Sequence, residues 1–270
     1  MPMLKFNDGN KIPCLGLGIW QIPAETTAES VSGAIDLGYR LIDGAAIYGN
    51  ELGLGEGVRA SNVPRDQIFI TTKIWNDRQG HDETLRAFDE SVARLGLNPD
   101  LLLIHWPCPD KDLYVDTWRA LIRLRDEGRV KSIGVSNFGA DHLERLIDQT
   151  GVTPVLNQIE LHPRMQQAAL RSLHDRLGIV TQSWTPLGKG GVFDAAPIVQ
   201  AAGRTGKTPA QVILRWHMQL GLSAIPRSTN PGRQAQNNDI FDFALTEDEM
   251  AAIATLDSGS RLGPDPMVFS

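Results

Sequence analysis

The sequence has little cysteine, no long hydrophobic run and no run of basic residues. Its two cysteines, Cys14 and Cys108, are too few and too isolated for a disulfide framework, and neither lies at a metal-ligand spacing from the six histidines. No apolar run approaches transmembrane length, and polar turn residues follow the N-terminus before a signal-peptide core could form. We therefore expect a cytoplasmic protein with two buried thiols and no metal site.

The charge of the chain limits its choice of partners. The net charge of -6 is mildly acidic, and no cluster of Lys and Arg is present to attract nucleic acid or an anionic membrane. Hydrophobic residues make up 41% of the chain and charged residues 21%, so the chain can bury a core as a globular protein. We expect a monomer that acts on a small molecule and binds neither nucleic acid nor membrane.

Short apolar segments alternate with segments of helical period along nearly the whole chain. In residues 83–95, for example, Leu85, Phe88 and Val92 recur at three- and four-residue spacing and leave charged side chains for water. Alternating strands and helices predict parallel pairing, and near-continuous apolar strands predict a sheet covered on both faces. The predicted strands occupy residues 15–17, 41–43, 68–72, 101–104, 131–135, 155–158, 179–182 and 223–225.

Eight such units fit a closed (β/α)8 barrel, a fold that typically takes about 250 residues. Before the first unit, residues 4–6 and 11–13 flank Asp8-Gly9, a pair that favours a tight hairpin turn. An open doubly wound sheet is the alternative, but no G-x-G-x-x-G pattern follows the first strand, and Gly16-Leu17-Gly18 imitates it only in part. We predict an α/β protein with one TIM-barrel domain over residues 1–270 and an N-terminal β-hairpin.

Four polar side chains with catalytic chemistry stand at or just beyond strand ends. Asp43, Lys73 and His105 each end an apolar strand, from the second, third and fourth strands, and Tyr48 follows Asp43 closely. Taken singly, each has an ordinary explanation as a helix cap, a solvated lysine, a core histidine or a packing tyrosine. In a barrel, however, the carboxyl ends of the strands meet at one mouth. Four such residues at equivalent strand ends therefore favour one shared site over four separate explanations.

Such a group suits the protonation of a carbonyl oxygen. A phenol has an unperturbed pKa of about 10, and an adjacent ammonium favours phenolate and lowers that pKa. Lys73 supplies the ammonium, and Asp43 holds it protonated and in place. His105 then donates a hydrogen bond to a substrate oxygen beside the Tyr48 hydroxyl.

Five motifs at successive predicted strand ends extend this pattern. They are residues 43–51, Thr72-Lys73-Ile74-Trp75, Ile104-His105-Trp106-Pro107, Gly134-Val135-Ser136-Asn137-Phe138 and residues 157–163. In these motifs the sequence resembles the aldo-keto reductases over essentially its whole length. Its short loops and C-terminal portion look most like bacterial 2,5-diketo-D-gluconate reductases and methylglyoxal reductases. The resemblance implies an NADPH-dependent carbonyl reductase with the catalytic tetrad Asp43, Tyr48, Lys73 and His105.

The resemblance also implies a set of residues around the nicotinamide. Ser136, Asn137 and Gln158 would hold its carboxamide, because an amide needs both donors and acceptors. The indole of Trp184 would stack beneath the nicotinamide and fix the face that delivers hydride. The residues implied at the pyrophosphate are Leu187 and Gly188.

Residues 225–233, which follow the last predicted strand, form a basic loop. NADPH differs from NADH by a 2′-phosphate, and Arg227, Ser228 and Arg233 offer cations and a hydroxyl for it. A helix that starts near Pro231 would point free amide groups at the same phosphate. Gln236 stands where the family commonly has a glutamate at the adenine, so we expect NADH to be used at lower efficiency. The implied cofactor site also includes Thr229 and Asn237.

An apolar rim is predicted around the mouth. The residues just beyond strand ends one to four include Trp20, Ile47, Trp75 and Trp106. An apolar rim over a polar floor predicts small aldehydes and dicarbonyls as substrates and, less strongly, keto sugars. The chain ends soon after Pro266, without the long C-terminal loop of the mammalian family members, so we expect a less enclosed pocket.

Two other functions remain compatible with the residues. A lysine at a barrel strand end can form a Schiff base with a carbonyl, as in a lyase, but it must be neutral and Asp43 would keep Lys73 charged. A regulatory module could keep the cofactor site with little turnover, as potassium-channel β-subunits resemble this family.

Overall fold

Eight parallel strands form one curled sheet in the computed structural model, which describes residues 1–270. The strands pair in sequence order, each with the next, from β3 to β10. Their bounds are β3 Leu17–Gly18, β4 Leu41–Asp43, β5 Phe69–Ile74, β6 Leu101–Ile104, β7 Ser132–Ser136, β8 Leu156–Glu160, β9 Val180–Trp184 and β10 Ser223–Ala224.

The two edges of this sheet meet, which closes it into a barrel. Leu15 forms a parallel bridge with Ala224. The amide of Ala224 donates to the carbonyl of Cys14 over 2.8 Å, and the amide of Gly16 donates to the carbonyl of Ala224 over 2.9 Å. Closure leaves no free edge between the first and last strands. The predicted (β/α)8 barrel is confirmed, and the open doubly wound sheet is excluded.

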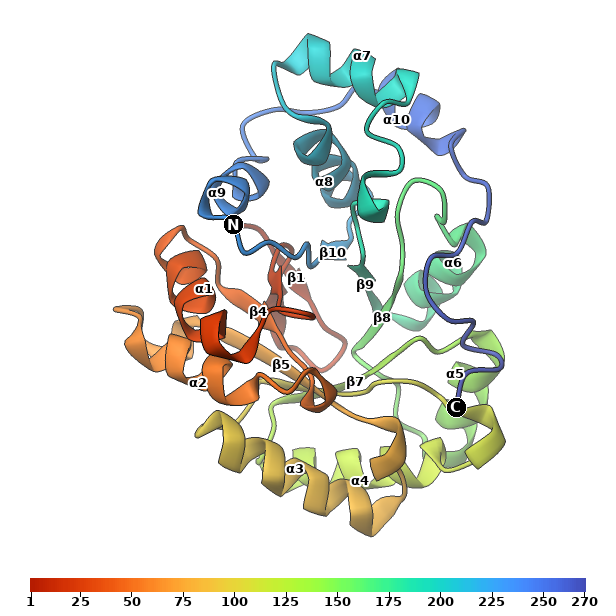
Figure 1. Cartoon of the computed structure of the whole chain (residues 1–270). Helices are drawn as coiled ribbons and strands as arrows, with labels where there is room; N and C mark the ends of the chain where they lie inside the picture. The colour runs from red at the N-terminus through yellow and green to blue at the C-terminus, as the bar shows by residue number, and fades with distance from the viewer.

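Ten α-helices surround the barrel, as Figure 1 shows. None of them is both long enough and apolar enough to cross a bilayer. Both α7 and α8 lie between β9 and β10, and α10 follows α9 near the end of the chain. Their bounds are α1 Ala24–Asp36, α2 Glu51–Ala60, α3 His81–Leu95, α4 Tyr114–Asp126, α5 Ala140–Thr150, α6 Ala168–Leu177, α7 Ala196–Thr205, α8 Pro209–Gln219, α9 Pro231–Asn238 and α10 Glu247–Ala254.

The starts of two helices follow directly from their sequences. Thr208 caps α8 by accepting the amide of Gln211 over 3.3 Å, and Thr246 caps α10 by accepting the amide of Glu249 over 3.2 Å. The side chains of Gln211 and Glu249 reach back to the cap amides, so both capping boxes are complete. Each cap contributes about 1 kcal/mol to helix stability.

An N-terminal hairpin covers the end of the barrel where the strands begin. Its strands, β1 Met3–Lys5 and β2 Lys11–Pro13, pair antiparallel. The side chain of Asn7 donates to the carbonyl of Pro154, which lies just before β8. Two hairpin side chains, Phe6 and Ile12, are buried in one cluster with residues near the strand starts. The hairpin therefore closes this end and leaves the opposite end, where the strands finish, for a site.

The strand ends differ from the prediction where the barrel interior is polar. Strands β8 and β9 continue to Glu160 and Trp184, two residues past their predicted ends. Gln158 and Gln182 point into the barrel and are at most 2% exposed, so buried amides interrupt the apolar pattern without ending the strands. Barrel interiors near the mouth are where a site replaces apolar packing with polar groups.

Candidate active site

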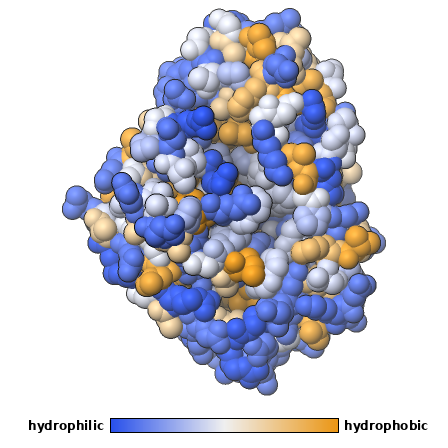
Figure 2. All heavy atoms as spheres, in the orientation of Figure 1, coloured by the Kyte–Doolittle hydropathy of each residue, from blue (hydrophilic) through white to orange (hydrophobic).

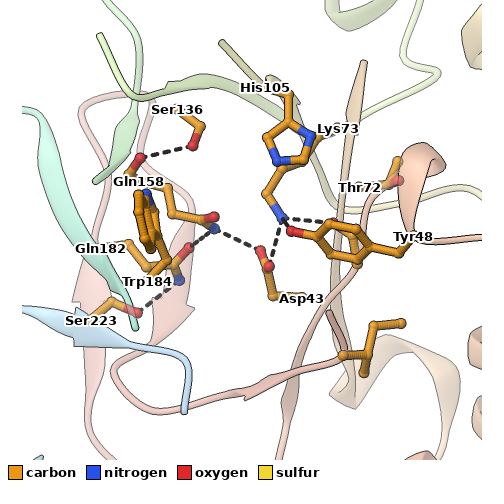
Figure 3. A network of polar contacts seen from close by, with 12 residues as sticks. Asp43, Tyr48, Thr72, Lys73, His105, Ser136, Gln158, Gln182, Trp184 and Ser223 are labelled. Carbon is orange, nitrogen blue, oxygen red and sulfur yellow. Dashed lines mark hydrogen bonds and ion pairs between the residues drawn. The ribbon is translucent and has the colours of Figure 1, made fainter. Parts of the chain in front are cut away.

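The four predicted catalytic residues meet at the mouth of the barrel. Asp43 is the last residue of β4, Lys73 lies in β5 one residue before its end, and His105 directly follows β6. Tyr48 ends a short 3₁₀ helix, Ala46–Tyr48, in the loop after β4. Figure 3 shows the four side chains gathered around the Lys73 ammonium. Parallel pairing of adjacent strands brings these residues together.

The Lys73 ammonium is the centre of the group. Its Nζ donates to Oδ1 of Asp43 over 2.6 Å and to the carbonyl of Gly44 over 2.8 Å, and it lies 3.4 Å from the hydroxyl of Tyr48. Lys73 is fully buried and Asp43 is 1% exposed. Burial opposes the charge on Lys73, but Asp43 and Tyr48 outweigh it and hold the pKa of Lys73 above its ordinary value. The ammonium is therefore charged at neutral pH.

Burial also governs the pKa of Tyr48. Removal from water raises the pKa of the phenol, the charge of Lys73 opposes the shift, and the charge of Asp43 adds to it. The expected net lowering is therefore wrong for this site, because the sequence indicated the ammonium but not how deeply the hydroxyl lies. Burial likewise raises the pKa of Asp43, against the opposing effects of Lys73 and Gln158. A phenol with a raised pKa carries its proton at neutral pH.

His105 completes the group as a neutral imidazole. Burial, together with the nearby charge of Lys73, lowers its pKa well below the ordinary value. Its ring lies 5.7 Å from that of Tyr48, edge to face, and 5.0 Å from that of Trp75. The residue is 7% exposed, and its Nδ1 has no hydrogen-bond partner. A neutral imidazole can donate one hydrogen bond without adding a second positive charge.

Three predicted carboxamide-binding residues adjoin the tetrad. Gln158 donates from Nε2 to Oδ2 of Asp43 over 2.7 Å. Ser136, at the end of β7, donates to the carbonyl of Gln158 over 2.8 Å. Asn137 has a left-handed backbone with φ of 65° and donates to the carbonyl of His105 over 3.0 Å. Direct hydrogen bonds thus connect this amide-rich wall to two members of the tetrad.

The predicted nicotinamide platform lies on the same wall. Trp184 ends β9, is partly exposed, and donates from its indole nitrogen to Oδ1 of Asn137 over 2.8 Å. Leu187 and Gly188 follow in the next turn. The side chain of His217, in α8, holds this turn in place. Its Nδ1 is hydrogen-bonded to the hydroxyl of Ser183 over 3.1 Å, and its Nε2 is hydrogen-bonded to the carbonyl of Pro186 over 3.0 Å. Sequence reasoning missed His217, because a histidine inside a helix gives no signal of its partners.

The basic loop after β10 is exposed from Arg227 onward except for the half-buried Ser228, and α9 begins at Pro231 as predicted. The Asn230 side chain accepts the amide of Arg233 over 3.0 Å, so the helix start offers fewer free amides than expected. The Ser228 hydroxyl donates to the carbonyl of Asn230 at 3.3 Å. The two arginine side chains therefore carry most of the attraction for an anion. Of the other predicted residues, those exposed are Thr229 and Gln236, and the one buried is Asn237.

The predicted apolar rim is present but uneven. Trp20 and Ile47 are each 48% exposed, whereas Trp106 is 7% exposed and Trp75 lies between. Figure 2 shows this face hollowed at its centre. The chain has no group of three or more His, Cys, Asp or Glu side chains placed to hold a metal ion.

The C-terminal segment, although short, contributes to the rim. In Figure 1 it runs from α10 past α6 and ends near α5. The ring of Phe269 lies 4.7 Å from that of Trp106. Upstream, the amides of Leu262 and Gly263 donate to the fully buried carboxylate of Glu160. A short tail thus reaches the mouth because a buried acid holds its backbone.

Comparisons with known proteins agree with this geometry. A sequence model described as the Aldo/keto reductase family matches residues 14–258. An aldo-keto reductase of Mycolicibacterium smegmatis is 53% identical over 270 residues, which cover 100% of this chain and 98% of the relative. Methylglyoxal reductase DkgA of Escherichia coli is 50% identical over 270 residues, which cover 99% of this chain and 98% of the relative.

Solved structures give the same result. The crystal structure of a Gox0644 mutant in complex with NADPH superposes with a TM-score of 0.96 at 50% identity, over 100% of this chain and 98% of the other. An aldo/keto reductase from Brucella melitensis superposes with a TM-score of 0.92 at 52% identity, over 95% of this chain and 99% of the other. The match extends over nearly the whole length of both partners. This chain belongs to the aldo/keto reductase family of oxidoreductases.

Proposed function

We propose that this protein reduces small carbonyl compounds to alcohols, with NADPH as the hydride donor and Tyr48 as the proton donor. The observation that carries the proposal is the buried Lys73 ammonium, which lies 2.6 Å from Asp43 and 3.4 Å from the Tyr48 hydroxyl. This arrangement supports the proposal, because a protonated phenol beside a fixed positive charge would stabilise the negative charge that develops on a carbonyl oxygen.

The residues present fit the nicotinamide cofactor. Ser136, Asn137 and Gln158 offer hydroxyl and amide groups beside the tetrad, and Trp184 offers a flat, partly exposed ring. Two exposed arginines, Arg227 and Arg233, suit the 2′-phosphate that distinguishes NADPH from NADH. When bound, the cofactor supplies the hydride. The expectation of NADP(H) is confirmed at the level of the family, whose Gox0644 neighbour is in complex with NADPH.

Each member of the tetrad has a distinct part in the reaction. The hydroxyl of Tyr48 gives its proton to the carbonyl oxygen, and in the reverse direction the phenolate takes it back. Lys73 stabilises the phenolate by its charge, and Asp43 keeps Lys73 charged and in position. Neutral His105 donates a hydrogen bond to the substrate oxygen and so orients the carbonyl beside Tyr48.

The rim supports small aldehydes and dicarbonyls as the substrate class. Trp20, Trp75 and Trp106 give the mouth an aromatic wall, and Phe269 extends it from the C-terminal segment. Aromatic walls bind the apolar part of a ligand, and the polar floor orients its reacting oxygen. The relatives named methylglyoxal reductase DkgA favour a dicarbonyl. Keto sugars, which are more polar, fit this rim less well.

The geometry argues against the alternative functions to different degrees. A Schiff-base lyase needs a neutral lysine, whereas Lys73 is paired with Asp43 and its pKa is raised. A regulatory module would have no use for the assembled proton donor.

The test is a panel of aldehydes, dicarbonyls and keto sugars, in which NADPH oxidation by the purified protein is measured by absorbance. We expect the fastest turnover with dicarbonyls or activated aldehydes, and no oxidation with any of them would overturn the proposal.

A further inference from the structure

A chain of buried side chains crosses the barrel behind the tetrad, and two of its members, Gln182 and Ser223, have no part in the mechanism described so far. Gln158 donates from Nε2 to Oε1 of Gln182 over 2.7 Å, and Gln182 donates from Nε2 to Oγ of Ser223 over 2.9 Å. Its far end is the carbonyl of Pro13, which accepts the Ser223 hydroxyl at 3.5 Å. Gln182 and Ser223 are fully buried. Figure 3 shows the chain extending from Asp43 across strands β8, β9 and β10.

This chain has only one consistent direction. A backbone carbonyl can only accept a hydrogen bond, so the Ser223 hydroxyl donates to Pro13 and presents its oxygen to Gln182. Gln182 must then direct its NH₂ group at Ser223, which leaves its Oε1 facing Gln158. The carbonyl of Pro13 therefore fixes which atoms donate and which accept along the whole chain.

The amide of Gln158 is oriented by acceptors on two sides. Its Nε2 lies 2.7 Å from Oε1 of Gln182 and 2.7 Å from Oδ2 of Asp43, so both amide hydrogens are used. If this amide were flipped, its oxygen would face two other acceptors at the same distances, in a buried site where unmade hydrogen bonds are costly. The amide oxygen of Gln158 is therefore the atom left to meet a ligand.

We propose that Gln182, braced by Ser223, is a positioning residue that makes Gln158 present an acceptor oxygen to the NH₂ group of the nicotinamide carboxamide. The inference rests on the proposed function, because it assumes that a nicotinamide cofactor binds beside Gln158. Gln182 itself touches neither cofactor nor substrate in this scheme. Together with Asp43, it sets which half of the Gln158 amide the cofactor meets.

The test compares two dinucleotides that differ only at the group in question. One is NADPH, and the other is its 3-acetylpyridine analogue, in which a methyl ketone replaces the carboxamide and has no hydrogen to donate. Dissociation constants are measured by quenching of tryptophan fluorescence for the parent, for Gln182→Leu and for Gln182→Glu. A buried, protonated glutamic acid keeps one acceptor oxygen for Gln158 and one O–H for Ser223, so this variant is the matched control.

We expect Gln182→Leu to weaken NADPH binding about fivefold to tenfold, the effect of one hydrogen bond, and to leave the affinity for the acetylpyridine analogue unchanged. Gln182→Glu should restore NADPH binding. Equal losses for both dinucleotides, or no loss for NADPH, would overturn the inference, since a purely structural role cannot discriminate between the ligands. A parent that binds neither dinucleotide would overturn the proposed function as well.

A second variant covers the case in which Gln182→Leu does not fold. Ser223→Ala removes only one hydroxyl and allows the Gln182 amide to turn over. We expect a smaller loss of NADPH affinity, again with no loss for the analogue. A loss of the same size for both ligands in a folded Ser223→Ala variant would count against the inference.

Discussion

The Lys73→Met variant tests the electrostatic basis of the proposed mechanism. Methionine is similar in length to lysine but carries no charge. The Lys73 ammonium is buried and lies 3.4 Å from the Tyr48 hydroxyl. Two unit charges at that distance interact by ~5 kcal/mol at an effective dielectric constant of about 20. The substitution therefore removes a stabilisation of the phenolate of that order.

The expected effect on the rate follows from this energy. If the proton is about half transferred in the transition state, roughly half of the interaction, ~2.5 kcal/mol, is lost from catalysis, which corresponds to about 10²-fold in kcat. The NADPH dissociation constant should change little, because the partners of Lys73 are Asp43, Gly44 and Tyr48 and not the residues assigned to the cofactor. Rates are measured by NADPH absorbance and binding by fluorescence quenching. A folded variant with a kcat near that of the parent would refute the argument.

The pH dependence gives a second readout of the same variant. Reduction needs the protonated phenol, so activity is lost as pH rises through the pKa of Tyr48. Lys73 lowers that pKa against the larger effect of burial. Without Lys73 the alkaline loss should therefore move to higher pH than in the parent. A move to lower pH would contradict the assigned sign.

A double variant controls for folding. Loss of Lys73 leaves the Asp43 carboxylate buried without its partner, at a cost of about 3–5 kcal/mol. Combining Asp43→Asn with Lys73→Met removes both charges, so the melting temperature should recover most of the way to the parent value. Activity should stay low. Recovery of activity together with stability would show that the ammonium was needed only for folding.

Three further predictions concern the rest of the site. Arg233→Ala should lower the ratio of kcat/KM for NADPH over NADH at least tenfold, through loss of charge-assisted hydrogen bonds; an unchanged ratio would show that this loop does not bind the 2′-phosphate. Phe269→Ala should raise KM for dicarbonyls severalfold with little change in kcat, because it removes one wall of the rim; an unchanged KM for every substrate would exclude the C-terminal segment from the pocket. The pKa of His105 lies well below its ordinary value near 6.5, so kcat/KM should be flat between about pH 6 and pH 8. If kcat/KM of the parent instead titrates in that window and the titration is absent in His105→Gln, His105 is not a neutral imidazole.

The barrel and the position of the tetrad were predictable because both depend on local pattern. Apolar strands that end on a charged or polar residue place Asp43, Lys73 and His105 at one edge whatever the packing of the helices. Capping boxes at Thr208 and Thr246 fix helix starts through neighbours three residues away. In each case the signal that predicts the structure is contained in residues that are close together in the sequence.

The features that escaped prediction depend on contacts between distant residues. The pKa of Tyr48 is raised because its hydroxyl is buried in the folded barrel, and the residues around Tyr48 in the sequence do not reveal that burial. The path of the C-terminal segment depends on amides at Leu262 and Gly263 bonding Glu160, about a hundred residues earlier. The catalytic residues of the site were therefore easier to predict from the sequence than the pKa of Tyr48 or the contribution of the C-terminal segment to the rim.

The central claim is that Tyr48 donates the proton that completes reduction. Single-turnover reduction of a dicarbonyl by preformed complexes with NADPH isolates this step in the parent and in Tyr48→Phe. Phenylalanine keeps the ring and removes the hydroxyl, so we expect the rate to fall about 10²- to 10⁴-fold, with NADPH affinity unchanged. A Tyr48→Phe rate within a few fold of the parent would contradict the mechanism.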